Sequence, residues 1–470
     1  MNNAKFIALG AIVQQLLSFA VILLITRLLG ADGYGEVVTL MAIATTIFNF
    51  SAQWAQPYMV RTESVSYAKN QKIGSAFFIP SLISFFILLV ATYLFTHYFS
   101  KALGDISTIP VSMIYFSAIS YFLFQMAKIG LQIQSRFGYY GLLLSLDKLM
   151  LLMILGSFVL FHLLTKAHVL WAYIAGTMLA GMGGLGLCLY KLHDWKKGCF
   201  LYNDYAKSIA PVSASVAIHY FSSITFVILI TREIESAQFV AWIGMGNIIL
   251  GVLLQPINWL APTLAPKLSR DVLEANSHVR IGCYLQDWVL PSTLIILWIT
   301  ICTITVILFT PLLPRLLGNG FQDGTTIIAL VALLTTAEAS NLMLVQLVYA
   351  RKLEKIVLLA VIFKAIPLLT GYAFGASVEL LLILLNLGSW LAIAISLLGI
   401  RSYLQRKWVL QYATLGILAF LASVMVTLHS GKWLLGVVLI AITLPTILLC
   451  RRMVGRFGLD RARAKVGSGA

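Results

Sequence analysis

The chain has little charge, and that charge is divided unevenly by sign. Of its 470 residues only 11% are charged, 17 acidic against 33 basic, whereas 60% are hydrophobic. This balance excludes an ordinary soluble domain and a disordered chain. The net charge of +16 would suggest nucleic acid in a soluble protein, but the bases lie at the ends of apolar segments. We therefore expect membrane lipids, and no nucleic acid, as the partner of this charge.

Motifs for catalysis, metals and cofactors are also absent. The five cysteines form no CxxC pair, which argues against a disulfide framework and against a zinc site. No Walker A, HExxH or kinase signature occurs, and the GxGxxG match at Gly181–Gly186 lies inside an apolar run with no strand before it. The sequence thus predicts no enzyme, no metal and no cofactor.

Long apolar runs are abundant, each near the ~20 residues that cross a hydrocarbon core. Continuous runs of this length disfavour a β-barrel. The connections are short on both sides, so no folded domain fits outside the membrane. The sequence predicts an all-α integral membrane protein with about 14 transmembrane helices, at 5–29, 36–59, 75–98, 109–133, 141–163, 168–190, 208–231, 237–262, 286–310, 325–349, 355–374, 378–400, 409–428 and 432–450.

Most of the basic residues lie in every second connection between these runs, and therefore on one side of the membrane. If the N-terminus lies inside, 27 of the 33 bases fall in or beside inner connections, Lys148 among them. The outer side keeps six, namely Arg27, Lys101, Lys166, Arg232, Arg315 and Lys432. By the positive-inside rule both termini are expected in the cytoplasm.

A weak internal repeat relates the two halves. Ile25–Arg27 closes the first run as Ile230–Arg232 closes the seventh, and Gln56-Pro57 and Gln255-Pro256 lie at similar depth, with the prolines as matched helix breaks. Six crossings separate the repeats, so they are parallel, as in transporters with a site between two halves. The domains expected are a six-helix bundle at 1–200, a second at 201–405, two added helices at 406–455 and a basic cytoplasmic tail at 456–470.

The stretch Leu23–Gly35, LLITRLLGADGYG, resembles the first helix end and first outer loop of polysaccharide exporters. These are the O-antigen repeat-unit (Wzx-type) flippases of the MATE-like MOP exporter superfamily. The motif covers residues 10–60 and the hydropathy plan covers the whole chain. The resemblance implies two bundles around a central cavity, two added C-terminal helices, and alternating-access export of an undecaprenyl-diphosphate-linked oligosaccharide across the bacterial inner membrane. A polysaccharide polymerase and a chain-length regulator are further candidate partners.

Glu338 lies near the middle of the tenth run, beside hydroxyl and amide side chains. Ionisable groups in a bilayer are costly, so each is a functional candidate. A buried carboxylate with oxygen neighbours can bind a proton or Na⁺, which makes Glu338 the candidate coupling-ion site. A carboxylic acid bonded to a neighbouring helix for packing is the alternative.

Five basic residues are candidates for the path of a diphosphate. Lys128 and Lys364 lie inside runs, where an ammonium offers a point charge; snorkelling to the headgroups is the alternative for Lys128. Arg27 and Arg232 are equivalent in the repeat and would meet phosphate at the outer side, or else neutralise helix dipoles. Arg61 would meet the diphosphate at the inner side, or else serve as an anchor.

Polar stripes on four helices point inward, where they would line a water-filled sugar path or bind helices together. The stripes are Gln14, Gln15 and Ser18; Asn49, Gln53 and Gln56; His219, Ser222, Ser223 and Phe226; and Gln255, Asn258 and Trp259.

Three other functions are weighed against the flippase. A multidrug or cation exporter of the same fold would place carboxylates in the N-terminal cavity, and we expect none at mid-depth in the first six runs. A polysaccharide polymerase or glycosyltransferase would need a substantial catalytic loop, which the short connections disfavour. A purely structural role is disfavoured because it would not explain the charged residues Glu338 and Lys364 inside apolar runs.

Overall fold

The computed structural model describes residues 2–70, 73–99, 110–161, 165–189, 213–255, 257, isolated positions between 298 and 309, 312–350 and 353–399. All regular structure in this part is helical, and nine helices there are long and apolar enough to cross a membrane. The predicted all-α membrane fold is confirmed. The runs predicted at 409–428 and 432–450, and most of 286–310, lie outside the described residues.

Helix α1 (Asn2–Ser51) contains the first two predicted runs, joined at a kink instead of a loop. Gly30 carries the change of direction with φ 73° and ψ −174°, a conformation that glycine adopts without the steric cost of a Cβ. The outer connection predicted between residues 29 and 36 is therefore shorter than expected. The predicted break at Pro57 is confirmed, because α1 ends at Ser51 and a 3₁₀ turn, η1 (Gln53–Ala55), precedes α2 (Gln56–Asn70).

The described helices pack into two groups. The first contains α3 (Ser75–Leu94) with its π-helical end η2 (Phe95–Phe99), α5 (Val111–Ile133), α6 (Phe137–Leu160) and α7 (Lys166–Leu189). The second contains α9 (Ile224–Ile234), α10 (Ala237–Leu253), α13 (Leu313–Leu317), η5 (Asn319–Phe321), α14 (Thr325–Ala350), α15 (Glu354–Ala373) and α16 (Val378–Gly399).

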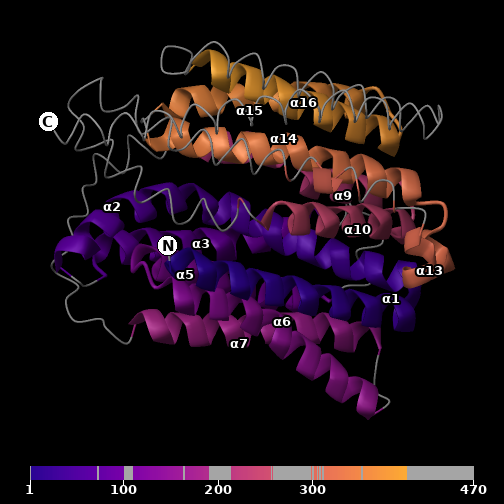
Figure 1. Cartoon of the computed structure of the whole chain (residues 1–470), viewed down its shortest axis with the longest axis horizontal. Coiled ribbons are helices and arrows are strands. Elements are labelled where there is room, and N and C mark those ends of the chain that lie inside the picture. Colours follow the sequence, from indigo (N-terminus) through magenta and orange to yellow (C-terminus); the bar gives the residue numbers. More distant parts are fainter. Residues whose placement is uncertain are drawn as a thin grey trace, which may run out of the picture.

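Helix α1 lies between the groups and packs on both, against α6 and α5 on one side and α10 and α9 on the other (Figure 1). Helices α14, α15 and α16 pack together away from α5, α6 and α7. We call the first group, together with α1 and α2, the N-terminal bundle, and the second group the C-terminal bundle. The domain boundaries predicted at 200 and 405 fall outside the described residues and stay predictions.

The two bundles meet at the end of the molecule where α1 kinks, here called the Gly30 end. Arg27 donates to the carbonyl oxygen of Leu316 through Nε at 3.1 Å and Nη2 at 2.9 Å. A Cβ built on Gly320 would lie 3.1 Å from the Cβ of Ala31. Gln238 and Trp242 of α10 each donate to the carbonyl of Gly320 at 2.8 Å. Arg27 thus joins the two bundles at the Gly30 end, while Gln238 and Trp242 hold η5 against α10 within the C-terminal bundle.

Candidate functional site

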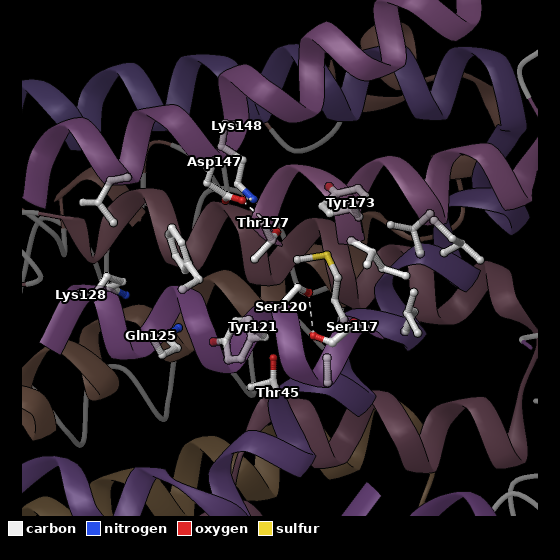
Figure 2. Close-up of a pocket in the computed structure, with 18 of the residues that line it drawn as sticks. Thr45, Ser117, Ser120, Tyr121, Gln125, Lys128, Asp147, Lys148, Tyr173 and Thr177 are labelled. Carbon is white, nitrogen blue, oxygen red and sulfur yellow. Dashed lines mark hydrogen bonds and ion pairs between the residues drawn. The ribbon is translucent and has the colours of Figure 1, made fainter. Parts of the chain in front are cut away.

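A hollow of about 240 Å³ lies inside the N-terminal bundle, between α1, α5, α6 and α7 (Figure 2). Most of its labelled lining is polar and uncharged, with hydroxyl and amide groups that donate and accept hydrogen bonds. Its polar and charged lining consists of Gln14, Thr45, Ser117, Ser120, Tyr121, Gln125, Lys128, Asp147, Lys148, Tyr173 and Thr177. We call it the N-terminal hollow.

An ion pair on α6 forms one wall of this hollow. Lys148 Nζ lies 2.8 Å from Asp147 Oδ2, with the two side chains 15% and 6% exposed. The hydroxyl of Thr177, on α7, donates to Asp147 Oδ1 at 2.9 Å. Each oxygen of the carboxylate therefore has a partner, and these partners offset the free-energy cost of burying its charge.

Lys128 on α5 adds a second positive charge to the hollow. Its ammonium lies 5.7 Å from the centroid of the Phe124 ring, within the range of a cation–π contact. It interacts electrostatically with Asp147, but among the described residues it forms no direct ion pair. With Lys148 neutralised by Asp147, the described lining of the hollow carries a surplus of one positive charge.

The expectation that the first six runs hold no carboxylate at mid-depth is wrong. Asp147 is the eleventh of the 24 residues of α6, and Lys148 is the twelfth. At 1.5 Å per residue, these positions lie about 16 Å from the start of the helix, in its middle. Lys148 is therefore no headgroup anchor of an inner connection. The count of inner bases suggested otherwise because it credited this lysine to the nearest loop.

A second ion pair lies in the C-terminal bundle. Lys364 of α15 donates to Glu338 Oε1 of α14 at 2.5 Å, and Ser389 of α16 donates to the same oxygen at 3.1 Å. Lys364 is 1% exposed and Glu338 20% exposed. His219 interacts electrostatically with both. The sequence assigned Glu338 and Lys364 to separate roles, and the structure brings them into one centre.

The chain beside this centre is a broken helix. Residues 213–220 are helical, and a turn interrupts them before α9 begins at Ile224. The Ser222 and Ser223 hydroxyls donate to the carbonyls of His219 and Tyr220 at 3.0 and 2.7 Å. Ser223 also caps α9, accepting from the Phe226 amide. The hydroxyls of the predicted polar stripe thus satisfy backbone groups freed by the break, as an apolar environment demands.

The two centres share a lysine, a hydroxyl and a glycine in similar places, although the carboxylate lies on the lysine's own helix in one centre and on another helix in the other. Lys148 and Lys364 lie near the middle of α6 and α15, and the hydroxyls of Thr177 and Ser389 lie on the next helix, α7 and α16. A glycine precedes each hydroxyl and faces the backbone of the lysine-bearing helix. An added Cβ would be in tight contact with Leu151 N at 3.0 Å for Gly176 and would collide with the Lys364 carbonyl for Gly388. Gly176 lets α7 approach α6, where Thr177 reaches Asp147. Gly388 lets α16 approach α15, and Ser389 contacts the carboxylate with which Lys364 of α15 pairs.

The other predicted site residues are dispersed. Gln53 and Gln56 are half-buried in η1 and at the start of α2, and Gln255 is half-buried just after α10. Arg61 lies in α2, with its side chain outside the described residues, as is the whole of Asn258. Arg232 is half-buried in the last turn of α9, while Arg27 lies at the Gly30 end. Of these residues, the ones whose side chains the structure describes do not line the hollow that contains Lys128.

Within the described part of the chain, no group of three or more His, Cys, Asp or Glu residues is arranged to hold a metal. The Asp147–Lys148 pair and Thr177 were not predicted from the sequence. Two adjacent charged residues well inside an apolar run could have revealed this pair. Like Glu338, they are costly in a bilayer and are therefore candidates for function.

The chain is similar to solved transporter structures. A mutant of the Vibrio cholerae MATE transporter VcmN aligns with 13% identity over 87% of this chain and 97% of its own, with a TM-score of 0.62. A multidrug resistance MATE family transporter of the MOP superfamily, in an outward-facing conformation, aligns with 13% identity over 88% and 94% and a TM-score of 0.63.

The lipid II flippase MurJ, in an inward closed conformation, aligns with 13% identity over 96% of this chain and 99% of its own, with a TM-score of 0.54. No protein-family description and no curated protein sequence matches the chain. At these identities the likeness concerns the fold. The chain is a multi-pass α-helical membrane protein with the fold of the MOP-superfamily transporters.

Proposed function

We propose that this protein is a flippase that moves an undecaprenyl-diphosphate-linked oligosaccharide, an O-antigen or related repeat unit, across the bacterial inner membrane by alternating access. The observation that carries the proposal is the N-terminal hollow, where Lys128 and Lys148 face one carboxylate among hydroxyl and amide groups. An anionic headgroup is attracted by the surplus positive charge, and neutral polar groups suit the attached sugar.

The alternating-access step follows from the closure of the Gly30 end. With both termini in the cytoplasm, as the distribution of bases predicts, the Gly30 end faces outward. Export then requires Arg27 to leave the carbonyl of Leu316 and the contact between Ala31 and Gly320 to part. These few polar contacts on exposed backbone are weak enough to break during each cycle. Arg27 thereby gains a gating role beside the phosphate contact proposed for it.

The coupling-ion role belongs to the Glu338 centre. A proton or Na⁺ that neutralises Glu338 competes with Lys364 for the same carboxylate oxygen. The broken helix beside it provides backbone groups that can rearrange, as discontinuous helices do in other transporters. Ion binding at Glu338 would release Lys364, and this release would couple the gradient to the movement of the bundles. Glu338→Gln should then remove any dependence of transport on the gradient.

A second candidate is export of an organic cation, and Asp147 is the observation that favours it. A carboxylate in the N-terminal hollow could bind a cation, but Lys148 and Thr177 already occupy both of its oxygens. Binding a cation there would require Lys148 to be displaced, next to a second ammonium at Lys128. We therefore rank the anionic substrate first.

The experiment uses the purified chain in liposomes that contain a fluorescent undecaprenyl-diphosphate oligosaccharide. Transbilayer movement is followed under imposed proton or Na⁺ gradients, with empty liposomes as the control. Protein-dependent movement supports the proposal. Export of organic cations together with no movement of any lipid-linked glycan would replace it with the second candidate.

A further inference from the structure

We infer that the binding site has two connected compartments: the N-terminal hollow holds the diphosphate, and a second hollow between the bundles receives the neutral glycan. This inference rests on the function proposed above and assigns the two chemical parts of the substrate to different residues.

The second hollow, here the interbundle hollow, has a volume of about 260 Å³. Helices α1, α6 and α7 form one wall, and α9 and α10 form the other. It therefore lies at the place where the two bundles meet, and its walls separate or approach whenever the bundles move. Its lining is Gln15, Ser18, Ile22, Tyr34, Val38, Met41, Ala42, Thr45, Lys148, Tyr173, Thr225, Ile228, Gly244, Asn247, Ile248 and Gly251.

The interbundle hollow differs from the N-terminal hollow in charge. Lys148 is the one charged side chain in its lining, at the boundary, whereas Lys128 and Asp147 line the N-terminal hollow alone. The remaining polar lining is neutral, with amides at Gln15 and Asn247 and several hydroxyls. Amides and hydroxyls both donate and accept, as a sugar's hydroxyl groups do. A prenyl chain would leave these groups without partners, so the glycan is the better occupant.

Four residues line both hollows and join them: Met41, Thr45, Lys148 and Tyr173. Lys148 Nζ lies 2.8 Å from Asp147 on the charged side and 5.5 Å from the centroid of the Tyr173 ring. A molecule with an anionic group next to a neutral glycan would span this boundary, with its phosphate near Lys148 and Lys128. The Tyr173 ring offers an apolar surface at the junction, against which a sugar ring can pack.

One face of α10 lines the hollow, and it leaves open space at Gly251. Gly244, Asn247, Ile248 and Gly251 follow one another at helical spacing of three, one and three residues, and all line the hollow. A Cβ built on Gly251 meets no atom within 4 Å. A side chain added at this position therefore starts in open space on the wall of the hollow.

The test measures binding of two probes to the full chain in nanodiscs: undecaprenyl diphosphate, and undecaprenyl diphosphate that carries a neutral trisaccharide. Gly251→Leu fills the interbundle hollow and Asn247→Leu removes its amide. Gly183→Leu is the matched control, because Gly183 is exposed on α7 and its added Cβ also meets nothing within 4 Å. Circular dichroism and thermal unfolding establish that each variant is folded.

We expect Gly251→Leu and Asn247→Leu to weaken binding of the trisaccharide probe about tenfold, while undecaprenyl diphosphate binds within twofold of wild type and Gly183→Leu changes neither. Equal weakening of both probes, or of neither, would overturn the division into compartments. Wild-type protein that binds neither probe would instead overturn the proposed function, so the two failures are distinguishable.

Discussion

Lys364 and Glu338, 26 residues apart in sequence, form a direct ion pair between α15 and α14, with 2.5 Å between Nζ and Oε1. Lys364 is fully buried, and the Ser389 hydroxyl supports the carboxylate from a third helix. The pair therefore connects three helices of the C-terminal bundle through one oxygen atom.

Removing one partner of this pair should destabilise the protein strongly. Lys364→Met leaves the Glu338 carboxylate, which is only 20% exposed, without its ion-pair partner; for a fully buried pair such a loss typically costs about 3–5 kcal/mol. The double variant Lys364→Met/Glu338→Gln should recover most of this loss, because no charge remains unpaired. Thermal unfolding in detergent measures both.

The Lys166–Glu36 pair is the matched control, since it has a similar length of 2.9 Å but Lys166 is 53% exposed. Lys166→Met should cost only about 0.2–1 kcal/mol. A Lys364→Met effect no larger than that of Lys166→Met would contradict the account of the buried pair.

The close packing of α16 on α15 at Gly388 should contribute to the stability of the protein, as the neighbouring ion pair does. A Cβ there collides with the backbone carbonyl of Lys364, so Gly388→Ala should force α15 and α16 apart and lower the unfolding temperature. Gly186→Ala, at an exposed α7 site where an added Cβ meets nothing, should be neutral or stabilising by up to about 1 kcal/mol. Equal unfolding temperatures for the two variants would remove Gly388 from this role.

The apolar runs and the depth of a single charge within a run were predictable from the sequence. A membrane span needs about 20 apolar residues, and a charge within such a span is rare because it is costly. The run that became α14 and the central position of Glu338 were found in this way. Its partner was not, because contact between α14 and α15 depends on how the helices pack and not on residue spacing. Asp147 and Lys148 were missed because Lys148 was counted with the bases of an inner connection, although both residues lie in the middle of α6.

The short loop expected near Gly30 is a single kink, since one glycine at positive φ suffices to redirect a continuous helix. Equally, no sequence pattern places Gly320 against Ala31, because that contact joins segments 289 residues apart. Contacts between the bundles are therefore the part of the site that only the structure supplies.

Locking the Gly30 end should stop transport. In a cysteine-free background, Ala31→Cys/Gly320→Cys places two Cβ atoms 3.1 Å apart. A disulfide needs about 3.5–4.5 Å between them, so the two segments must separate by a few tenths of an ångström for the bond to form. Oxidation should abolish movement of the lipid-linked glycan, and a reductant should restore it. Each single cysteine variant is the control. Undiminished transport by a fully cross-linked protein would show that this end need not open.

Glu63 should make stability depend on pH. It is buried in α2, outside the membrane-spanning helices, and accepts from the Gly74 amide at 2.6 Å. Burial raises the pKa of its carboxyl group above the ordinary 4.5, although the backbone hydrogen bonds oppose this. The unfolded chain therefore releases this proton first, so stability falls as pH rises from about 4.5 to the folded pKa and then levels off.

Glu63→Gln removes that fall while keeping an acceptor for the Gly74 amide. Unfolding temperatures measured from pH 4 to neutrality should show wild type losing stability relative to Glu63→Gln. Glu235→Gln, at an exposed position, should follow the wild-type profile. Parallel profiles for wild type and Glu63→Gln would count against a raised pKa.

Selection for an anionic headgroup by the N-terminal hollow is the central claim, and transport by Lys128→Met tests it most directly. Movement of an undecaprenyl-diphosphate glycan in liposomes is compared between wild type, Lys128→Met and Lys355→Met, the last removing an exposed lysine at the start of α15. The account predicts that Lys128→Met slows movement at least tenfold while Lys355→Met stays near wild type. Equal rates in all three proteins, with wild type active, would contradict it.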